Sequence, residues 1–144
     1  MHLTSSIAAR CGPWVIGLAG LACLVVPGTG AWAADTTPAQ QLERFSALAG
    51  APGQADRGQV FFSSRHGGEW SCSSCHGQPP LTAGKHASTG KVIAAFAPAV
   101  NPKALTSTAK VDKWFRRNCV DVLERECTAG EKADLLAYLL QIKP

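Results

Sequence analysis

The motif Cys-Ser-Ser-Cys-His, at residues 72–76, constrains this chain more than any other feature of its sequence. Two cysteines separated by two residues and followed by histidine have the spacing for covalent haem attachment. The two thiols add across the vinyl groups of the haem, and the histidine then reaches the iron from one side. The motif therefore predicts one haem c, attached through Cys72 and Cys75, with His76 as the proximal iron ligand.

Two other uses of a Cys-x-x-Cys pair fit the rest of the sequence less well. A thioredoxin-type redox pair belongs to a βαβ pattern, and this chain has no alternating strand pattern. Half of a zinc site would need a second pair of ligands, but His66 and His86 have no paired spacing. A bound haem also explains how a short domain forms a core, because the faces of a haem are apolar.

Residues 1–33 have the organisation of a secretory signal peptide. Arg10 supplies a positive charge, residues 14–26 form an apolar run that is short for a membrane span, and the small residues "AWA" follow. Pro27 and Gly28 break the run, which disfavours an uncleaved anchor. We therefore expect cleavage after Ala33, export to the periplasm, and no membrane span in the remaining chain.

Cleavage at this point leaves a single expected domain at residues 34–144. Cys11 and Cys23 would leave with the signal, and the other cysteines would reach an oxidising compartment. The 14 Lys and Arg only mildly exceed the 10 Asp and Glu, and no basic cluster is interleaved with aromatic residues. Nucleic acid is therefore not an expected partner, although a weakly basic face could steer an acidic protein.

Helical patterns account for most of the expected domain, and the predicted fold class is all-α. The proline-rich and glycine-rich residues 77–105 are predicted to form an ordered loop, with one turn of helix near Ile93. Helix-start signals include capping boxes at Thr37 with Gln40 and at Thr128 with Glu131. Helices are expected over residues 37–50, from about residue 56, from about residue 107, and after residue 128.

The second axial position of the iron is the question that the haem motif leaves open. Methionine is excluded, because the only methionine is Met1, in the expected signal. The remaining candidates are His66, His86, a lysine, a cysteine thiolate, Asn118 or no ligand at all. Asn118 lies on the apolar side of its helix, where an amide needs a partner. By spacing alone, an amide that caps the helix or bonds to backbone is favoured, and His86 remains a candidate for a bis-histidine haem.

The sequence resembles the SHP-type c-type cytochromes, the sphaeroides haem protein group, over nearly the whole expected domain. The matching runs are "TPAQ", "CSSCHG", "TGKVIAAFAP", "KVDKWFRRNC" and "ECTAGEKADLLAYL". The resemblance implies a class I cytochrome c fold, with a few short helices wrapped around one haem. It also implies that Asn118 is the distal iron ligand and that Cys119 forms a disulfide with Cys127. The loop around His86 looks longer than in the family, so His86 stays an alternative ligand.

The same resemblance implies a periplasmic electron-transfer protein that binds a diatomic gas when reduced. An amide oxygen is a hard, neutral ligand that suits ferric better than ferrous iron. Reduction should therefore release Asn118 and open the site to oxygen, nitric oxide or carbon monoxide. Members of this family are associated with dihaem c-type and membrane b-type cytochromes as electron donors.

Two other functions are compatible with the same residues. The first is a plain electron carrier in which Asn118 or His86 is a permanent sixth ligand. The second is a small reductase of oxygen, peroxide or nitric oxide, for which the chain lacks an acid–base set near the iron unless His86 supplies it.

The sequence predicts further roles for residues around the expected haem. Trp114 and Phe115 are expected to line the haem pocket or to pack between helices, and Phe96 to cover the distal side. A backbone carbonyl of Pro79 or Pro80 is expected to accept a hydrogen bond from the His76 ring.

Overall fold

The computed structural model describes residues 35–144, which belong to one compact unit. The expected signal peptide and its cleavage site lie outside the described residues. No helix in the described range is long and apolar enough to cross a membrane. The elements are α1 (Pro38–Ala49), α2 (Ala55–Ser63), α3 (Cys72–His76), β1 (Gly84–Lys85), β2 (Val92–Ile93), α4 (Thr108–Leu123) and α5 (Ala129–Gln141).

The all-α prediction is confirmed, with two local differences. The haem motif itself forms the short helix α3, and residues 84–93 contain a small antiparallel hairpin in which Gly84 pairs with Ile93. The helical turn expected near Ile93 is wrong, because Ile93 lies in β2. A tight turn from His86 to Gly90, closed by a 2.8 Å hydrogen bond from the Gly90 N–H, brings the two strands together.

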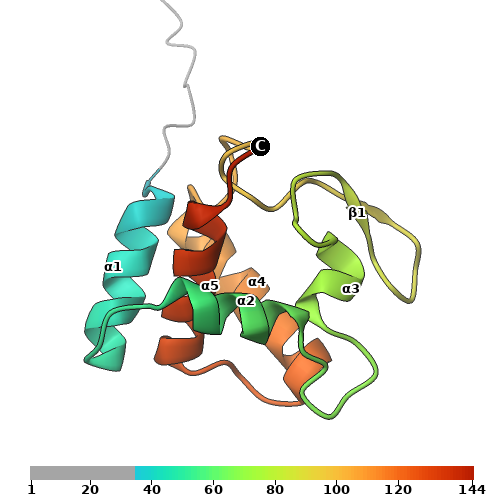
Figure 1. The fold of residues 1–144 in the computed structure, drawn as a ribbon, viewed down its shortest axis with the longest axis horizontal. Helices are drawn as coiled ribbons and strands as arrows, with labels where there is room; N and C mark the ends of the chain where they lie inside the picture. The colour runs from blue at the N-terminus through green and yellow to red at the C-terminus, as the bar shows by residue number, and fades with distance from the viewer. Residues whose placement is uncertain (1–34) are drawn as a thin grey trace, which may run out of the picture. The chain divides into compact units, whose positions relative to one another are not determined.

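The long helices enclose one hydrophobic core. Helix α5 packs against both α1 and α2, whereas α3 and β1 lie on the side of the fold away from α1 (Figure 1). Phe45 of α1 meets Phe115 of α4 edge to face at 5.5 Å between ring centroids. Phe62 of α2 meets Tyr138 of α5 at 5.6 Å. Aromatic pairs of this kind stabilise a fold in addition to the effect of the apolar area that they bury. They therefore help to hold α4 against α1 and α2 against α5.

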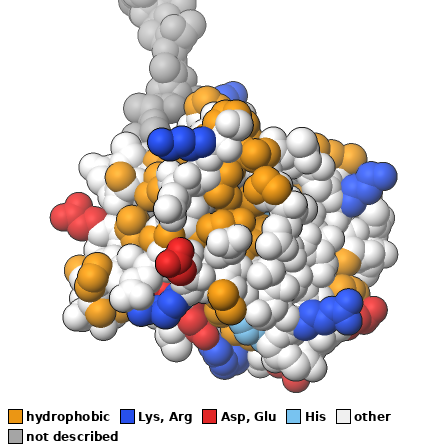
Figure 2. All heavy atoms as spheres, viewed as in Figure 1, with side chains coloured by type: hydrophobic (Ala, Val, Ile, Leu, Met, Phe, Trp, Pro, Cys, Tyr) orange, Lys and Arg blue, Asp and Glu red, His pale blue; other side chains and the backbone are white. Residues whose placement is uncertain are grey.

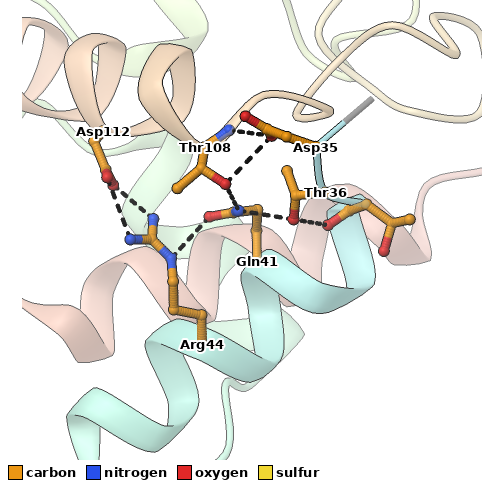
Figure 3. A network of polar contacts seen from close by, with 7 residues as sticks. Asp35, Thr36, Gln41, Arg44, Thr108 and Asp112 are labelled. Carbon is orange, nitrogen blue, oxygen red and sulfur yellow. Dashed lines mark hydrogen bonds and ion pairs between the residues drawn. The ribbon is translucent and has the colours of Figure 1, made fainter. Parts of the chain in front are cut away.

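A polar network joins the start of α4 to α1 (Figure 3). Ser107 provides no side-chain cap for α4, and the Asp35 carboxylate accepts a hydrogen bond from the Thr108 N–H instead, at 2.8 Å. The buried Gln41 amide donates to the hydroxyls of Thr36 and Thr108, at 2.9 and 3.1 Å. A carboxylate at a helix N-terminus satisfies unpaired N–H groups and opposes the helix dipole. This network positions α4 against α1.

Helices α2 and α5 approach so closely that their contact has no room for a side chain at Gly58. A Cβ at Gly58 would overlap the backbone carbonyl of Asp134 and lie 2.9 Å from Cβ of Tyr138. The Asp134 carboxylate, which is buried, accepts hydrogen bonds from Arg57 at 2.8 Å and from the Gln54 N–H at 2.7 Å. A buried carboxylate is tolerated because it is paired and hydrogen-bonded.

The first turn of α5 predicts a difference in acid stability between the wild type and Glu131→Gln. Hydrogen bonds from Arg125 lower the pKa of Glu131 from 4.5 to about 2, with further bonds from Thr128. The folded pKa lies below the unfolded one, so the stabilisation is present above pH 4.5 and is lost as the pH falls toward 2. The Arg125 side chain is 51% exposed, so solvent screens the ion pair. We therefore expect the wild type and Glu131→Gln to differ by only about 1 kcal/mol in the stability that they lose on acidification.

Urea denaturation, followed by circular dichroism at neutral pH and near pH 3, measures this difference. Glutamine keeps the capping geometry of Glu131 but not its charge. The wild type should lose about 1 kcal/mol more stability on acidification than Glu131→Gln. Equal losses in the two proteins would show that the Arg125–Glu131 pair does not contribute.

Candidate haem site

The haem motif is held as a single helical turn by its own flanking residues. The Ser71 hydroxyl accepts a hydrogen bond from the Ser74 N–H, and the Ser74 hydroxyl accepts one from the Ser71 N–H, which is a reciprocal capping box. The helix then ends at Gly77, whose φ of 76° lies in the left-handed region. Residues three and four apart share one face of a helix, so Cys72 and the neighbouring Cys75 and His76 project to the same side.

His76 lies near two aromatic side chains from other parts of the chain. Its ring centroid is 4.7 Å from that of Phe96 and 6.5 Å from that of Phe62 on α2. Burial lowers the pKa of His76. The neutral imidazole is therefore favoured, and this is the form that binds a metal ion.

The second-sphere hydrogen bond expected for His76 is not formed. The Pro79 carbonyl accepts from the Leu81 N–H, and the Pro80 carbonyl accepts from the N–H groups of residues 96 and 97. His76 Nδ1 is buried and has no hydrogen-bond partner among the described residues. The proline prediction is therefore wrong for this structure, because the loop turns back and uses these carbonyls for its own closure.

The two cysteines of the motif are free thiols and are partly buried. Burial raises the pKa of the Cys72 thiol to about 11, so it stays protonated at neutral pH. The Ala87 N–H of the hairpin donates a hydrogen bond to Cys75 Sγ at 3.3 Å. Within residues 35–144, no three His, Cys, Asp or Glu side chains are grouped as a metal-ion site.

Asn118 lies in the body of α4, between the buried positions Phe115 and Cys119. Its side chain is partly buried and makes no hydrogen bond to another described residue. The helix continues to Leu123 and ends with Glu124 in the left-handed conformation, so Asn118 is not its cap. The ordinary interpretation of Asn118, a cap or an amide bonded to backbone, therefore has no support in the structure.

The structure joins Cys119 and Cys127 in a disulfide whose Cα atoms are 5.5 Å apart. Both cysteines are buried in the hydrophobic core. Cys119 belongs to α4, and Cys127 precedes Thr128, the N-cap of α5. The bond therefore ties the second half of α4, next to Asn118, to the start of α5.

The aromatic residues predicted near the haem lie in different surroundings. Phe115 is buried against Phe45, so it packs between α4 and α1. Trp114 is 49% exposed, and its ring centroid is 5.5 Å from Lys113 Nζ and 5.4 Å from Arg117 Cζ. A haem-pocket role for Trp114 or Phe115 stays a prediction.

Phe96 does not cover the distal side as predicted. Its ring lies against His76, the candidate proximal ligand. The reason is the closure of the loop, because the Pro80 carbonyl accepts hydrogen bonds from the Phe96 and Ala97 N–H groups. These bonds place Phe96 beside α3.

The two other histidines considered as iron ligands are both engaged locally. His66 is exposed, and its Nε2 lies 2.8 Å from the Phe61 carbonyl oxygen. His86 lies at the turn of the hairpin, where its Nδ1 lies 3.1 Å from the Ser88 hydroxyl. Neither contact involves α4.

These residues fit a covalently attached haem. The structure supplies paired free thiols, a neutral imidazole and a buried, unpartnered Nδ1 on one short segment. Hydrophobic side chains also gather between the C-terminal end of the chain and the side that carries α3 and β1 (Figure 2). Partly exposed apolar side chains pack against the core, among them Phe61, Cys72, Phe96, Leu105, Leu123 and Ile142. A bound haem would cover apolar side chains of this kind.

Comparison with known proteins identifies the family. Residues 48–139 match the family model described as a domain of unknown function, DUF1924. The chain is 49% identical over 113 residues to the cytochrome c-type protein SHP of Cereibacter sphaeroides, covering 76% of this chain and 87% of that protein. This chain belongs to the SHP family of c-type cytochromes.

Further relatives support the same assignment. Oxidised SHP, described as an oxygen-binding cytochrome c, matches with a TM-score of 0.69 at 48% identity, over 73% of this chain and 96% of that structure. Cytochrome c'' of Methylophilus methylotrophus is 41% identical over 92 residues, or 60% of this chain and 64% of that protein. Its oxidised structure matches with a TM-score of 0.66 at 32% identity, over 74% and 95% of the two chains. The chain therefore has a cytochrome c fold, and its cofactor is haem c.

One residue that contacts the haem motif is not predicted from the sequence. A Cβ at Gly84 would lie 3.0 Å from the Cys75 carbonyl carbon and 3.1 Å from His76 Cα. Gly84 thus lets the hairpin lie directly on the haem motif. Nothing in the sequence distinguishes it from the other glycines of a loop.

Proposed function

We propose that this chain is a periplasmic monohaem cytochrome that takes part in electron transfer and, when reduced, releases Asn118 to bind a diatomic ligand. Asn118 carries the proposal, because this residue is partly buried on α4 and its side chain makes no hydrogen bond to another described residue. The relative SHP, which is described as an oxygen-binding cytochrome c, supports a gas ligand. The signal-like residues 1–33 support export.

The chain's own residues would do the following. Cys72 and Cys75 hold the cofactor covalently, and His76 donates its neutral imidazole. When bound, the haem would supply an iron that cycles between the ferric and ferrous states. Asn118 offers a hard, neutral oxygen, whose affinity is expected to fall when the iron gains an electron. Asn118 then withdraws and leaves space for oxygen, nitric oxide or carbon monoxide.

The disulfide beside Asn118 would limit how far this side chain withdraws. The Cys119–Cys127 bond spans 8 residues and fixes the backbone directly after Asn118. Such a link also stabilises a small domain by roughly 2 to 3 kcal/mol in the chain-entropy description. The two roles are compatible.

Replacing Asn118 by alanine tests the proposal. The ferric variant should lose its distal protein ligand, so its ferric spectra should change, while the reduced variant still binds carbon monoxide. Optical and electron paramagnetic resonance spectra of the oxidised protein, and optical spectra of the reduced protein with carbon monoxide, provide the measurement. His86→Ala is the matched control and should leave both spectra unchanged.

Three results would contradict the proposal. An unchanged ferric spectrum in Asn118→Ala would place the ligand elsewhere. A spectral change in His86→Ala would assign the ligand to His86. A wild-type haem that is low-spin in both oxidation states and does not bind carbon monoxide would instead support a six-coordinate electron carrier. The Ser88 contact and the position of His86 on the hairpin disfavour His86 as the permanent ligand of such a carrier.

A further inference from the structure

Helix α4 has a basic face opposite the side that it buries. Its buried positions are Val111, Phe115, Cys119 and Val122. Exposed side chains at i, i+3, i+4 and i+7 form one continuous stripe on the outward side. We call this stripe the basic α4 surface, and its members are Lys113, Arg116, Arg117 and Val120.

The cations of the basic α4 surface form no ion pair with a described carboxylate, although the exposed Asp121 follows Arg117 by one helical turn. Among residues 35–144 the ion pairs are Arg44–Asp112, Arg57–Asp134 and Arg125–Glu131, so none uses a cation of this surface. Asp112 of α4 lies 2.6 Å from Arg44, which directs its charge toward α1. Val120 is 46% exposed at one end of the stripe. Cations beside an exposed apolar side chain are typical of transient protein interfaces.

Trp114 links the basic α4 surface to the candidate iron ligand. Its ring centroid is 5.5 Å from Lys113 Nζ and 5.4 Å from Arg117 Cζ. Asn118 follows Trp114 by four residues, so the two side chains are neighbours on the helix. In order around the helix, Trp114 therefore lies between the cations and Asn118.

We propose that the basic α4 surface is the docking site for an acidic face of a protein that delivers electrons to this cytochrome. The inference rests on the proposed electron-transfer function. A partner on this surface would lie about 10 Å, one helix diameter, from the side of α4 that carries Asn118. Unpaired cations would steer an acidic partner and accelerate encounter, and salt would screen the attraction. The complex would be weak and short-lived, which suits repeated electron delivery.

Charge reversal on the haem-loaded protein tests the proposal. The test variant is Lys113→Glu with Arg117→Glu, and the control is Lys85→Glu with Lys91→Glu. The control changes the net charge by the same amount, at exposed hairpin positions that form no ion pair within the described residues. The probe is a small acidic iron–sulfur protein, chemically reduced beforehand, and stopped-flow absorbance gives its second-order rate of haem reduction.

The test variant should react at least about tenfold more slowly than the wild type at low salt. The difference should shrink as salt shortens the screening length. The control should lose less than about threefold. If the reduction rate falls equally in the two variants, the effect comes from net charge alone. If it falls more in the control, the partner docks at the hairpin. Either result overturns the proposal, as does a wild-type rate that does not depend on salt.

Failure of this inference can be distinguished from failure of the proposed function. Carbon monoxide binding by the dithionite-reduced protein tests Asn118 release without any protein partner. Co-sedimentation with anionic phospholipid vesicles tests a membrane surface as the other source of negative charge. Loss of vesicle binding in the test variant, with an unchanged rate of haem reduction, would overturn docking of a protein partner.

Discussion

Replacement of both Cys72 and Cys75 by serine is expected to abolish covalent haem attachment. A serine hydroxyl does not add to a haem vinyl group, so no thioether bond forms. Haem staining after denaturing electrophoresis should fall to background, and haem absorbance per polypeptide should fall more than about tenfold. The variant should also lose helix content, because the partly exposed apolar side chains around the site would have no haem to cover them.

A matched control is the removal of the other cysteine pair, by Cys119→Ser with Cys127→Ser. This variant loses the disulfide but keeps the complete haem motif, so it should retain stain and absorbance. Its unfolding midpoint should fall, in keeping with a loss of roughly 2 to 3 kcal/mol. Haem that remains covalently bound in the Cys72→Ser, Cys75→Ser variant would disprove the assignment of the attachment site.

Gly58→Ala is expected to destabilise the protein by roughly 3 kcal/mol. The added Cβ would overlap the backbone carbonyl of Asp134, and backbone atoms within a packed helix cannot move aside as a side chain can. Helix α2 would shift away from α5. Because Phe62 of α2 lies 6.5 Å from His76, the haem spectrum should change as well.

Gly130→Ala provides the control for Gly58→Ala. Gly130 lies in α5, where the nearest atom to an added Cβ is Thr128 Oγ1 at 4.0 Å. Alanine is the better helix former, so this change should stabilise the protein by about 0.5 to 1 kcal/mol. Urea denaturation of both variants gives the comparison. A loss below about 0.5 kcal/mol in Gly58→Ala would show that the α2–α5 contact relaxes at little cost.

Local signals predicted the helix starts well. The capping boxes expected at Thr37 with Gln40 and at Thr128 with Glu131 are both present in the structure. Each depends on two side chains three residues apart, so the sequence alone contains the whole interaction. The haem motif can likewise be recognised from a short segment, because its spacing places its functional side chains on one face of a single helical turn.

Long-range closure explains the predictions that failed. Residues 77–105 have weak periodicity, and their structure depends on contacts such as those from the Phe96 and Ala97 N–H groups to the Pro80 carbonyl. In the closed loop the β1–β2 hairpin forms and Phe96 lies beside His76. Nδ1 of His76 is left without the predicted acceptor. Glycines have no side chain to signal their role, so the close approaches at Gly58 and Gly84 could not be recognised either.

The sequence by itself determined the cofactor, the all-α class and the residues that compete for the iron. It did so because attachment spacing, capping and the single Met1 are properties of short segments and of composition. Only the tertiary structure decided how α4 is held. Asp35 caps this helix across 73 residues of chain, and Phe45 packs against Phe115. Those contacts leave the Asn118 amide without a protein partner and turn the basic α4 surface outward, since a helix can bury only the face that its neighbours cover.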